Sequence, residues 1–343
     1  MEKLRVAIVD DSGFMQLILS DIVNSDPLLT VVETGSDGKE AVDLVRRHKP
    51  DVLLLDMIMG EFDGKYAIEQ IMKFRPLPII VVSALNDKNP KVISDILELG
   101  AYDFISKPNG KNHHIRDLNI SLNSKIKGAV EGFKKQQSVR VNKNNHPHTF
   151  SEEIHYEAIV VGSSTGGPTT VEKFLLQLPE NLPVPVVIAQ HMPANFLKPY
   201  AQRLDKICPF PVTTVKTGDK IKRGTVYLLS GLANQTLERK LGRVIVSETS
   251  EQFKSFNNPS VDALFLSAAD VYKDKLISIV LTGMGADGRD GTIKIKDKGG
   301  RTIAQDEATS VVYGMPREAA ETGKVDHILP LDELGGFVVT CLS

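Results

Sequence analysis

The sequence contains no tryptophan, few aromatic residues and only two cysteines, Cys208 and Cys341. Two cysteines in 343 residues exclude a disulfide framework and a cysteine-rich zinc site. The formal net charge is −2, so a surface that coats nucleic acid is not expected. No apolar run approaches about 18 residues, and the first residues lack the long apolar stretch of a signal peptide. These absences predict a soluble, cytoplasmic protein that neither inserts into a membrane nor binds nucleic acid.

The sequence does contain an alternation of short apolar runs with amphipathic segments, on either side of a polar stretch. Its length predicts two domains, at roughly 100–200 residues each. We place the first domain at residues 1–130, a polar linker at 131–153 and the second domain at 154–343. Alternating strands and helices favour parallel sheets with helices on both faces. Both domains are therefore expected to be α/β, each with a doubly wound parallel sheet.

The strands expected in the first domain are short, rich in β-branched residues and bounded by Asp, Gly or Pro. They cover residues 5–10, 29–35, 50–57, 77–85 and 101–108. Helical spacing of apolar residues predicts helices over 13–25, 38–48, 65–74, 90–100 and 115–135. In the second domain the same criteria predict strands over 156–162, 184–191, 225–230, 243–248 and 275–283, and helices over 169–178, 199–207, 260–270 and 290–299.

Chemically active residues end four of the five strands expected in the first domain. Asp10 and Asp11 end the first strand, Asp56 the third, Ser83 the fourth and Lys107 the fifth. Ligands of parallel α/β sheets bind at these carboxyl ends. Converging carboxylates repel one another and need a cation, and their hard oxygen ligands suit Mg²⁺. A nearby lysine and hydroxyl could hold the oxygens of a phosphoryl group, and Asp56 is then a candidate nucleophile toward it. Any one aspartate at a strand end can be a turn former or helix cap, but four such positions in order are hard to attribute to turns.

The motifs "VDDS", "LLLDM", "VVSAL" and "DFISKP" at these spacings resemble a two-component receiver domain, over about residues 3–125. The resemblance implies a flavodoxin-like fold and phosphorylation of Asp56 by a histidine kinase. It also implies a receiver-bound Mg²⁺, held by Asp10, Asp11, Asp56 and the backbone carbonyl of Ile58. Three further residues are implied in sensing the phosphoryl group: Ser83, Lys107 and, as an aromatic switch, Phe104.

Residues 162–166, "GSSTG", lie between an expected strand and an expected helix and fit the pattern G-x-S-x-G. Small flanking residues permit a sharp turn that lifts the hydroxyl of Ser164 above the sheet. A phosphate-binding P-loop would need lysine where Pro168 stands, and a dinucleotide loop would need glycine in place of Ser164. A purely structural Gly/Ser turn remains an alternative at this point.

A nucleophilic serine needs a base, and the second domain offers His155, His191 and His327. His155 precedes the first strand and His327 lies between apolar residues late in the chain. His191 ends a strand, at the same sheet edge as Ser164, and is favoured for that reason. Asp287 follows the apolar run 275–283 in a glycine-rich loop and is the preferred orienting acid. Asp290 is expected to lie a turn into the next helix, and "GADG" can also be a plain tight turn.

The order Ser…His…Asp differs from the Ser…Asp…His order of an ordinary α/β-hydrolase. The motifs "SSTGGP", "QHMP", "PSVDALF", "LTGMGADGRDG" and "GGRTIAQDEATSVVYGMP" instead resemble the catalytic domain of the chemotaxis protein-glutamate methylesterase (CheB) family, over about 156–337. The resemblance implies a Rossmann-like catalytic domain with Ser164 as nucleophile, His191 as base and Asp287 as orienting acid. It further implies an oxyanion site formed by the backbone N–H of Met284, with Thr165 beside the nucleophile.

The same resemblance implies the reaction and its partners. The substrates would be methyl-esterified glutamates, and also glutamines, on the cytoplasmic helices of methyl-accepting chemotaxis receptors. The phosphodonor would be the chemotaxis histidine kinase, and the esterase step itself would need no cofactor. A flexible linker between a phosphoacceptor and a hydrolase suggests that the receiver limits receptor access until Asp56 is phosphorylated.

The two alternative functions for the second domain are DNA binding and docking on receptors without catalysis. A DNA-binding output would need a basic recognition helix, and the second domain shows no such pattern. A catalytically inactive adaptor that only docks on receptors would keep the fold without the chemistry.

Overall fold

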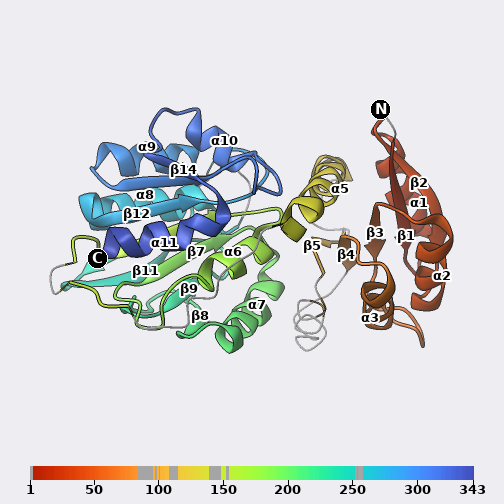
Figure 1. The fold of residues 1–343 in the computed structure, drawn as a ribbon, viewed down its shortest axis with the longest axis horizontal. Coiled ribbons are helices and arrows are strands. Elements are labelled where there is room, and N and C mark those ends of the chain that lie inside the picture. The colour runs from red at the N-terminus through yellow and green to blue at the C-terminus, as the bar shows by residue number, and fades with distance from the viewer. Residues whose placement is uncertain are drawn as a thin grey trace. The chain divides into compact units, whose positions relative to one another are not determined.

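The computed structural model describes residues 3–83, 96, 99, 101–107, 115–138, 148–151, 154–251, 253 and 258–343. The chain divides into two compact units, Met1–Lys134 and Lys135–Ser343 (Figure 1). Among the described residues, no helix is both long and apolar enough to cross a membrane.

The first unit contains a five-stranded parallel sheet in the order β2-β1-β3-β4-β5. This is the doubly wound order of flavodoxin-like folds, so the expected fold is confirmed. All five expected strands are present: β1 (Leu4–Val9), β2 (Leu29–Gly35), β3 (Val52–Leu55), β4 (Ile79–Ser83) and β5 (Asp103–Ser106). The described helices are α1 (Gly13–Asn24), α2 (Gly38–His48), α3 (Gly64–Phe74) and α5 (Ile115–Ser138). Apart from residues 96 and 99, the helix expected at 90–100 lies outside the described residues.

Short polar residues set the helix starts that follow these strands. The Ser12 hydroxyl accepts a hydrogen bond from the Met15 amide at the start of α1. The Asp63 carboxylate accepts one from the Tyr66 amide at the start of α3, at 2.9 Å. Such caps satisfy amides that have no partner within the helix. They fix the loops after β1 and β3, where Asp10 and Asp56 lie.

Helix α5 is longer than expected. The apolar spacing predicts it to residue 135, whereas it continues to Ser138. The first residues of the predicted linker, 131–138, are therefore helical, and the division between the two units falls at Lys134, near the start of that linker.

The second unit contains a seven-stranded parallel sheet in the order β14-β13-β12-β6-β7-β9-β8. Its strands are β6 (Ala158–Ser163), β7 (Val186–Gln190), β8 (Val212–Thr214), β9 (Val226–Leu228), β12 (Leu276–Val280), β13 (Arg301–Gln305) and β14 (His327–Leu329). The chain builds outward from β6 through β7, then returns to the other side of β6 at β12. Strand order thus reverses beside β6, and such a switch point is where open α/β sheets bind ligands.

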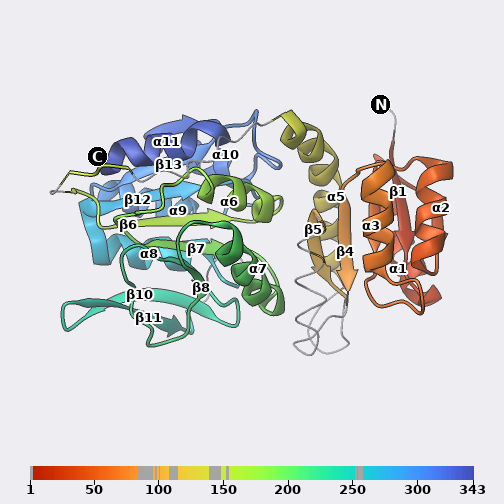
Figure 2. The same ribbon diagram turned by 60° about the horizontal axis from the view of Figure 1, so that its bottom comes forward.

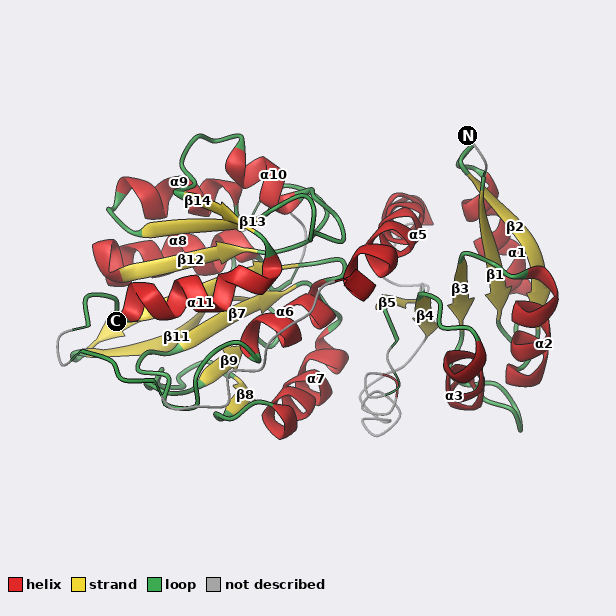
Figure 3. Ribbon diagram, viewed as in Figure 1, coloured by secondary structure: helices red, strands yellow, loops and turns green. Residues whose placement is uncertain are grey.

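The helices of the second unit cover both faces of this sheet, as a doubly wound fold requires (Figure 3). Figure 3 shows α6, α7 and α11 in front of the strands and α8 and α9 behind them. The helices are α6 (Gly167–Leu175), α7 (Ala194–Ile207), α8 (Val261–Tyr272), α9 (Arg289–Asp297), α10 (Met315–Ala320) and α11 (Leu331–Leu342), with a 3₁₀ turn, η1, at Lys273–Lys275.

One part of the second unit departs from the parallel arrangement expected for it. The strand expected at 243–248 is present as β11 (Arg243–Thr249), but it pairs antiparallel with β10 (Asn234–Lys240) in a separate two-stranded sheet (Figure 2). Positive φ angles at Leu241 (49°) and Gly242 (74°) form the two-residue turn that joins the two strands. Val244 and Val246 pack into the same buried cluster as α8, so the hairpin covers part of the domain core.

Candidate functional site

Three neighbouring strands of the second unit each deliver one of the expected active-site residues to the same edge. Ser164 directly follows β6, His191 directly follows β7, and Asp287 lies in the loop after β12. Ser163 is paired with Gln190 in the sheet, and the His191 amide donates to the Ser163 carbonyl at 2.9 Å. The sheet register therefore sets the two loops side by side at the switch point.

Two hydrogen bonds join the turn after β6 to the loop after β12. The Ser164 amide donates to the Thr282 carbonyl at 3.0 Å, and the Thr282 hydroxyl donates to the Thr165 carbonyl at 3.0 Å. Gly283 follows directly, and a β-carbon there would lie 2.8 Å from the Ser164 Cβ. The absence of a side chain at Gly283 is what allows this loop to lie against the serine.

His191 and Asp287 form a buried pair. The His191 Nε2 and an Asp287 carboxylate oxygen are 2.7 Å apart, with side-chain exposures of 7% and 1%. The carboxylate also accepts the Ser260 hydroxyl at 3.1 Å, the Val261 amide at 2.8 Å and the Asp262 amide at 2.8 Å. These three donors belong to the first turn of α8 and its cap, where the helix dipole favours negative charge.

The pKa of Asp287 follows from these contacts. Burial alone would raise it, but the hydrogen bond and charge of His191 and the amides of Asp262 and Val261 outweigh burial and leave the pKa below its ordinary value. The carboxylate is therefore ionised at neutral pH and can orient the imidazole and stabilise its protonated form.

The second imidazole nitrogen of His191 is free to accept a proton. Nδ1 is buried and has no hydrogen-bond partner among the residues that the structure describes. With Nε2–H donating to Asp287, the lone pair on Nδ1 is the basic atom of the ring. An unpartnered buried nitrogen at the sheet edge suits a base whose hydrogen bond is completed during reaction.

The surroundings of Ser164 suit a nucleophile. Ser164 is half-buried between fully buried neighbours, and Gly166, with φ of 72°, forms the sharp turn into α6. Within the described residues, no acceptor is found for the backbone N–H groups of Thr165 and Met284. Free amides beside a nucleophile are the donors that an oxyanion requires.

The alternatives to His191 and Asp287 lie elsewhere in the second unit. The His155 ring nitrogen is 3.2 Å from the Asp274 carbonyl, before β6, and the His327 ring nitrogen is 3.2 Å from the Arg301 guanidinium. Asp290 lies in the first turn of α9, in the helix where it was expected, although closer to the loop than expected.

Two supporting residues were not predicted from the sequence. Gln190 donates to the carbonyls of both Ser164 (2.9 Å) and His191 (3.0 Å) and so links the two loops. Ser260 caps α8 and contacts Asp287 directly. A cap at Ser260 could have been inferred from a serine that begins an apolar helical pattern, but its contact with residue 287 could not.

Asp262 provides a pH-dependent test of this region. It is 5% exposed, and burial raises its pKa to about 7, with the Gly291 amide opposing and the charges of Asp287 and Asp290 adding to the rise. Because the folded-state pKa exceeds the unfolded value of about 3.9, the protonated form stabilises the fold below about pH 4, and this contribution is lost as pH rises through about 7.

We expect Asp262→Asn, which keeps an oxygen for the Gly291 amide, to flatten that pH dependence. The difference in Tm between pH 5 and pH 8 should shrink by about 5 °C relative to the unaltered chain. The matched control is Asp270→Asn, an exposed aspartate on the same helix. Equal pH dependence in both variants would show that the Asp262 carboxyl does not titrate in this range.

The first unit gathers its charged residues at the carboxyl ends of β1, β3 and β5. One carboxylate oxygen each from Asp10, Asp11 and Asp56 lie within 4.8 Å of one another. The Lys107 ammonium is 2.6 Å from oxygens of both Asp10 and Asp56. The Met57 amide donates to Asp56 at 2.6 Å and the Ile58 amide at 3.3 Å.

The electrostatics of this cluster suit a divalent cation. Burial raises the pKa of Asp10, and the hydrogen bond from Lys107 offsets this only in part. Burial lowers the pKa of Lys107, but its hydrogen bonds to Asp10 and Asp56 outweigh burial and raise it. Three carboxylate oxygens converge on one point, and carboxylate oxygens are ligands that Mg²⁺ takes. Among the described residues, the Lys107 ammonium is the positive group that pairs with two of these carboxylates.

Two further residues expected to sense the phosphoryl group lie on β5 and at the end of β4. Phe104 is buried in β5, 3% exposed, and Ser83 ends β4. The side chain of Ser83 lies outside the described part of the chain.

The chain therefore joins two kinds of unit. The first is a flavodoxin-like unit with a carboxylate cluster, and the second is a doubly wound unit with a serine, a histidine and an aspartate at its switch point. The chain belongs to the CheB methylesterase family, which matches residues 159–338, and the response regulator receiver domain matches residues 6–119. The resemblance noted in the sequence is thereby confirmed for both halves of the chain.

Relatives support this membership over the full length. A protein-glutamate methylesterase/protein-glutamine glutaminase of Pyrococcus abyssi is 36% identical over 99% of this chain and 94% of its own. One from Burkholderia lata is 37% identical over 100% of this chain and 97% of its own. The crystal structure of the Thermotoga maritima CheB methylesterase catalytic domain is similar at 37% identity and a TM-score of 0.52, covering 54% of this chain and 98% of that one. The chain is thus an enzyme of the methylesterase class with a receiver domain.

Proposed function

We propose that this enzyme hydrolyses glutamate methyl esters on methyl-accepting chemotaxis receptors and deamidates receptor glutamines, using Ser164, His191 and Asp287. The observation that carries the proposal is the buried His191–Asp287 pair, 2.7 Å apart. His191 follows β7 and Asp287 lies in the loop after β12, and these two strands flank β6, which Ser164 follows. The order of these residues and their place at the switch point support the same reading.

The first half of the reaction acylates the serine. The Ser164 hydroxyl attacks the ester carbonyl while His191 Nδ1 takes its proton, and the Asp287 carboxylate stabilises the imidazolium. The Met284 and Thr165 amides donate to the oxygen that becomes negative. Collapse of the tetrahedral intermediate expels methanol, which receives the proton from Nδ1.

The second half releases the product. Water gives a proton to His191 Nδ1 and attacks the acyl carbonyl, and Ser164 leaves with the proton returned. A glutamine side chain follows the same path with ammonia as the first leaving group. No group beyond these side chains and water is needed to balance either reaction.

We propose Asp56 as the phosphoacceptor, with a chemotaxis histidine kinase as phosphodonor. Mg²⁺ would be held by Asp10, Asp11, Asp56 and the Ile58 carbonyl, and when bound it neutralises charge that develops on the transferred phosphoryl group. Lys107 and Ser83 would contact the phosphoryl oxygens, and Phe104 would be the aromatic residue that responds.

The proposed role of the receiver is to limit access to the catalytic face. Deleting residues 1–150 should then raise basal methanol release by roughly 5–150-fold, the range of typical coupling between two sites. The assay is methanol release from methylated receptor membranes, without phosphodonor. An unchanged or lower rate would contradict occlusion while leaving the esterase assignment intact.

The function as a whole is tested by methanol release from methylated receptor membranes with the full chain, Mg²⁺ and a small phosphodonor. We expect release that depends on enzyme and increases when the phosphodonor is added. Membranes incubated without enzyme give the background. No release above that background would contradict the esterase assignment.

A further inference from the structure

A basic pocket lies at the edge of the second unit opposite to Ser164 and His191. Its volume is about 600 Å³, and its lining includes Glu157 and Pro185, which directly precede β6 and β7. Ser164 and His191 follow the same two strands. A six-residue strand spans about 20 Å, so a ligand in this pocket would not touch the ester substrate.

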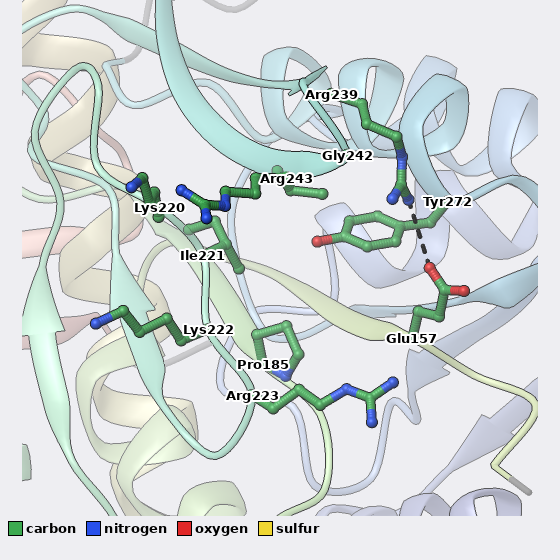
Figure 4. A pocket seen from close by; sticks show the side chains of 11 residues that line it. Glu157, Pro185, Lys220, Ile221, Lys222, Arg223, Arg239, Gly242, Arg243 and Tyr272 are labelled. Carbon is green, nitrogen blue, oxygen red and sulfur yellow. Dashed lines mark hydrogen bonds and ion pairs between the residues drawn. The ribbon is translucent and has the colours of Figure 1, made fainter.

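The lining of this basic pocket is strongly cationic (Figure 4). Its five cationic side chains are Lys220, Lys222, Arg223, Arg239 and Arg243. Its one carboxylate, Glu157, lies 3.4 Å from the Arg239 guanidinium and 2.8 Å from the Lys275 ammonium, so it is already paired twice. Five positive groups against one negative group give the lining a net formal charge of +4.

Four of these cations have no counter-ion among the described residues of the chain. Within the residues that the structure describes, no ion pair is formed by Lys220, Lys222, Arg223 or Arg243. Like charges around one hollow repel each other, and together they give a positive potential that attracts anions. A bound anion would relieve this repulsion.

The backbone that carries these cations is fixed by the fold. The segment bearing Lys220 and Lys222 lies along β11, with the Ile221 amide donating to the Val244 carbonyl at 2.9 Å. The Lys222 amide donates to the Tyr227 hydroxyl at 3.1 Å. The basic pocket therefore needs little rearrangement of the chain to bind a ligand.

The floor of the basic pocket adds a neutral donor. Tyr272 is 5% exposed, and its ring lies 5.8 Å from the Arg239 guanidinium carbon. Figure 4 shows its hydroxyl pointing into the hollow. Burial raises the pKa of Tyr272, so the phenol keeps its proton and can donate it to an anionic oxygen.

We propose that the basic pocket binds a small molecule with two or more linked phosphates, such as the triphosphate chain of a nucleotide. Guanidinium groups match phosphate oxygens in pairs, and lysines add point charge. A triphosphate carries about four negative charges at neutral pH, which matches the lining. The volume lies within the range of about 300–1,000 Å³ for small-molecule sites, and it exceeds what a single orthophosphate fills.

The test is isothermal titration calorimetry on the full chain at low salt, with EDTA to keep metal-dependent phosphate binding at the first unit silent. Tripolyphosphate should bind with a Kd on the order of 10 µM and orthophosphate at least about tenfold more weakly. The double variant Lys220→Gln/Arg243→Gln should weaken tripolyphosphate binding at least about tenfold. The matched control Lys298→Gln/Arg317→Gln, two exposed cations outside the basic pocket, should not change it.

ATP distinguishes the source of the phosphates. Tighter binding of ATP than of tripolyphosphate identifies a nucleotide, whereas equal binding identifies the phosphate chain alone as the recognised group. No tripolyphosphate binding below millimolar concentration would overturn the proposal. So would equal affinity in the double variant, shown by its unchanged Tm to be folded, or orthophosphate binding as tight as that of tripolyphosphate. Methanol release does not enter this test, so its outcome is independent of the proposed esterase function.

Discussion

Replacing Ser164 with alanine should lower methanol release from methylated receptor membranes by about 10⁴–10⁶-fold, while the fold is retained. The expected loss is this large because the proposed mechanism takes its attacking oxygen from this hydroxyl, and alanine leaves none in its place. His191, Asp287 and the free amides would remain in place and stabilise an oxyanion that no longer forms. The measurement is enzyme-dependent methanol release with circular dichroism to confirm folding.

The neighbouring serine provides the control for this prediction. Ser163 is fully buried at the end of β6, and its hydroxyl lies 3.4 Å from the Thr282 carbonyl. Ser163→Ala makes the same chemical change one residue away from the proposed nucleophile, so its methanol release should stay within about threefold of normal. If both variants lost activity equally, the turn as a whole, and not the Ser164 hydroxyl, would be responsible.

Replacing Asp56 with asparagine should abolish phosphoryl incorporation and every increase in methanol release that a small phosphodonor produces. An amide cannot form the acyl phosphate, because it lacks the nucleophilic carboxylate oxygen. It also replaces one of the three carboxylates that converge within 4.8 Å with a neutral amide, which is a weaker ligand for a cation. Basal release should be unchanged, since Asp56 lies in the first unit and the proposed esterase residues lie in the second.

The control for that prediction is Asp43→Asn on the exposed face of α2, which should keep full incorporation and full stimulation. Incorporation into the Asp56→Asn variant at the normal level would place the phosphoacceptor at another residue. If the Asp56→Asn variant lost phosphoryl incorporation but the phosphodonor still increased methanol release, regulation would not depend on phosphorylation of Asp56.

The strand-end residues could be predicted because parallel sheets place strand ends at one edge. Asp10, Asp56 and Lys107 follow apolar runs that the sequence shows directly, and in the structure the Lys107 ammonium lies 2.6 Å from an oxygen of each of the two carboxylates. The same reasoning joined His191 to Ser164. It also separated Asp287, in a loop, from Asp290, inside α9, where side chains project at helical spacing.

Other elements could not be predicted because tertiary contacts form them. β8 and β14 are three residues long, too short to show a period. β10 reads "NQTLERK", with only Gln235 and Leu237 buried, and it depends on its pairing with β11. α11 contains two glycines, and Gly335 lies where a β-carbon would be 2.2 Å from the Gln177 side chain, so packing overrides low helix propensity there.

The contacts that support Asp287 and the lining of the basic pocket both arise from the packing of elements that are far apart in the sequence. Ser260 and Asp287 are 27 positions apart, and their contact exists only because α8 begins beside the loop after β12. The pocket draws cations from the segment before β9 and from the β10–β11 hairpin, and a tyrosine from the end of α8, and no local pattern connects these segments. Sequence periodicity predicts elements and edges, whereas these contacts depend on how the elements pack.

The most direct test of the central claim is to partition the acyl-enzyme with hydroxylamine while methanol release is followed. If Ser164 is acylated before water acts, hydroxylamine should divert receptor glutamates to hydroxamates. Total methanol release should stay constant if acylation limits the rate, and Ser164→Ala should give no hydroxamate above the enzyme-free background. Glutamate as the only enzyme-dependent product, at hydroxylamine concentrations up to those that the fold tolerates, would contradict a covalent intermediate on Ser164.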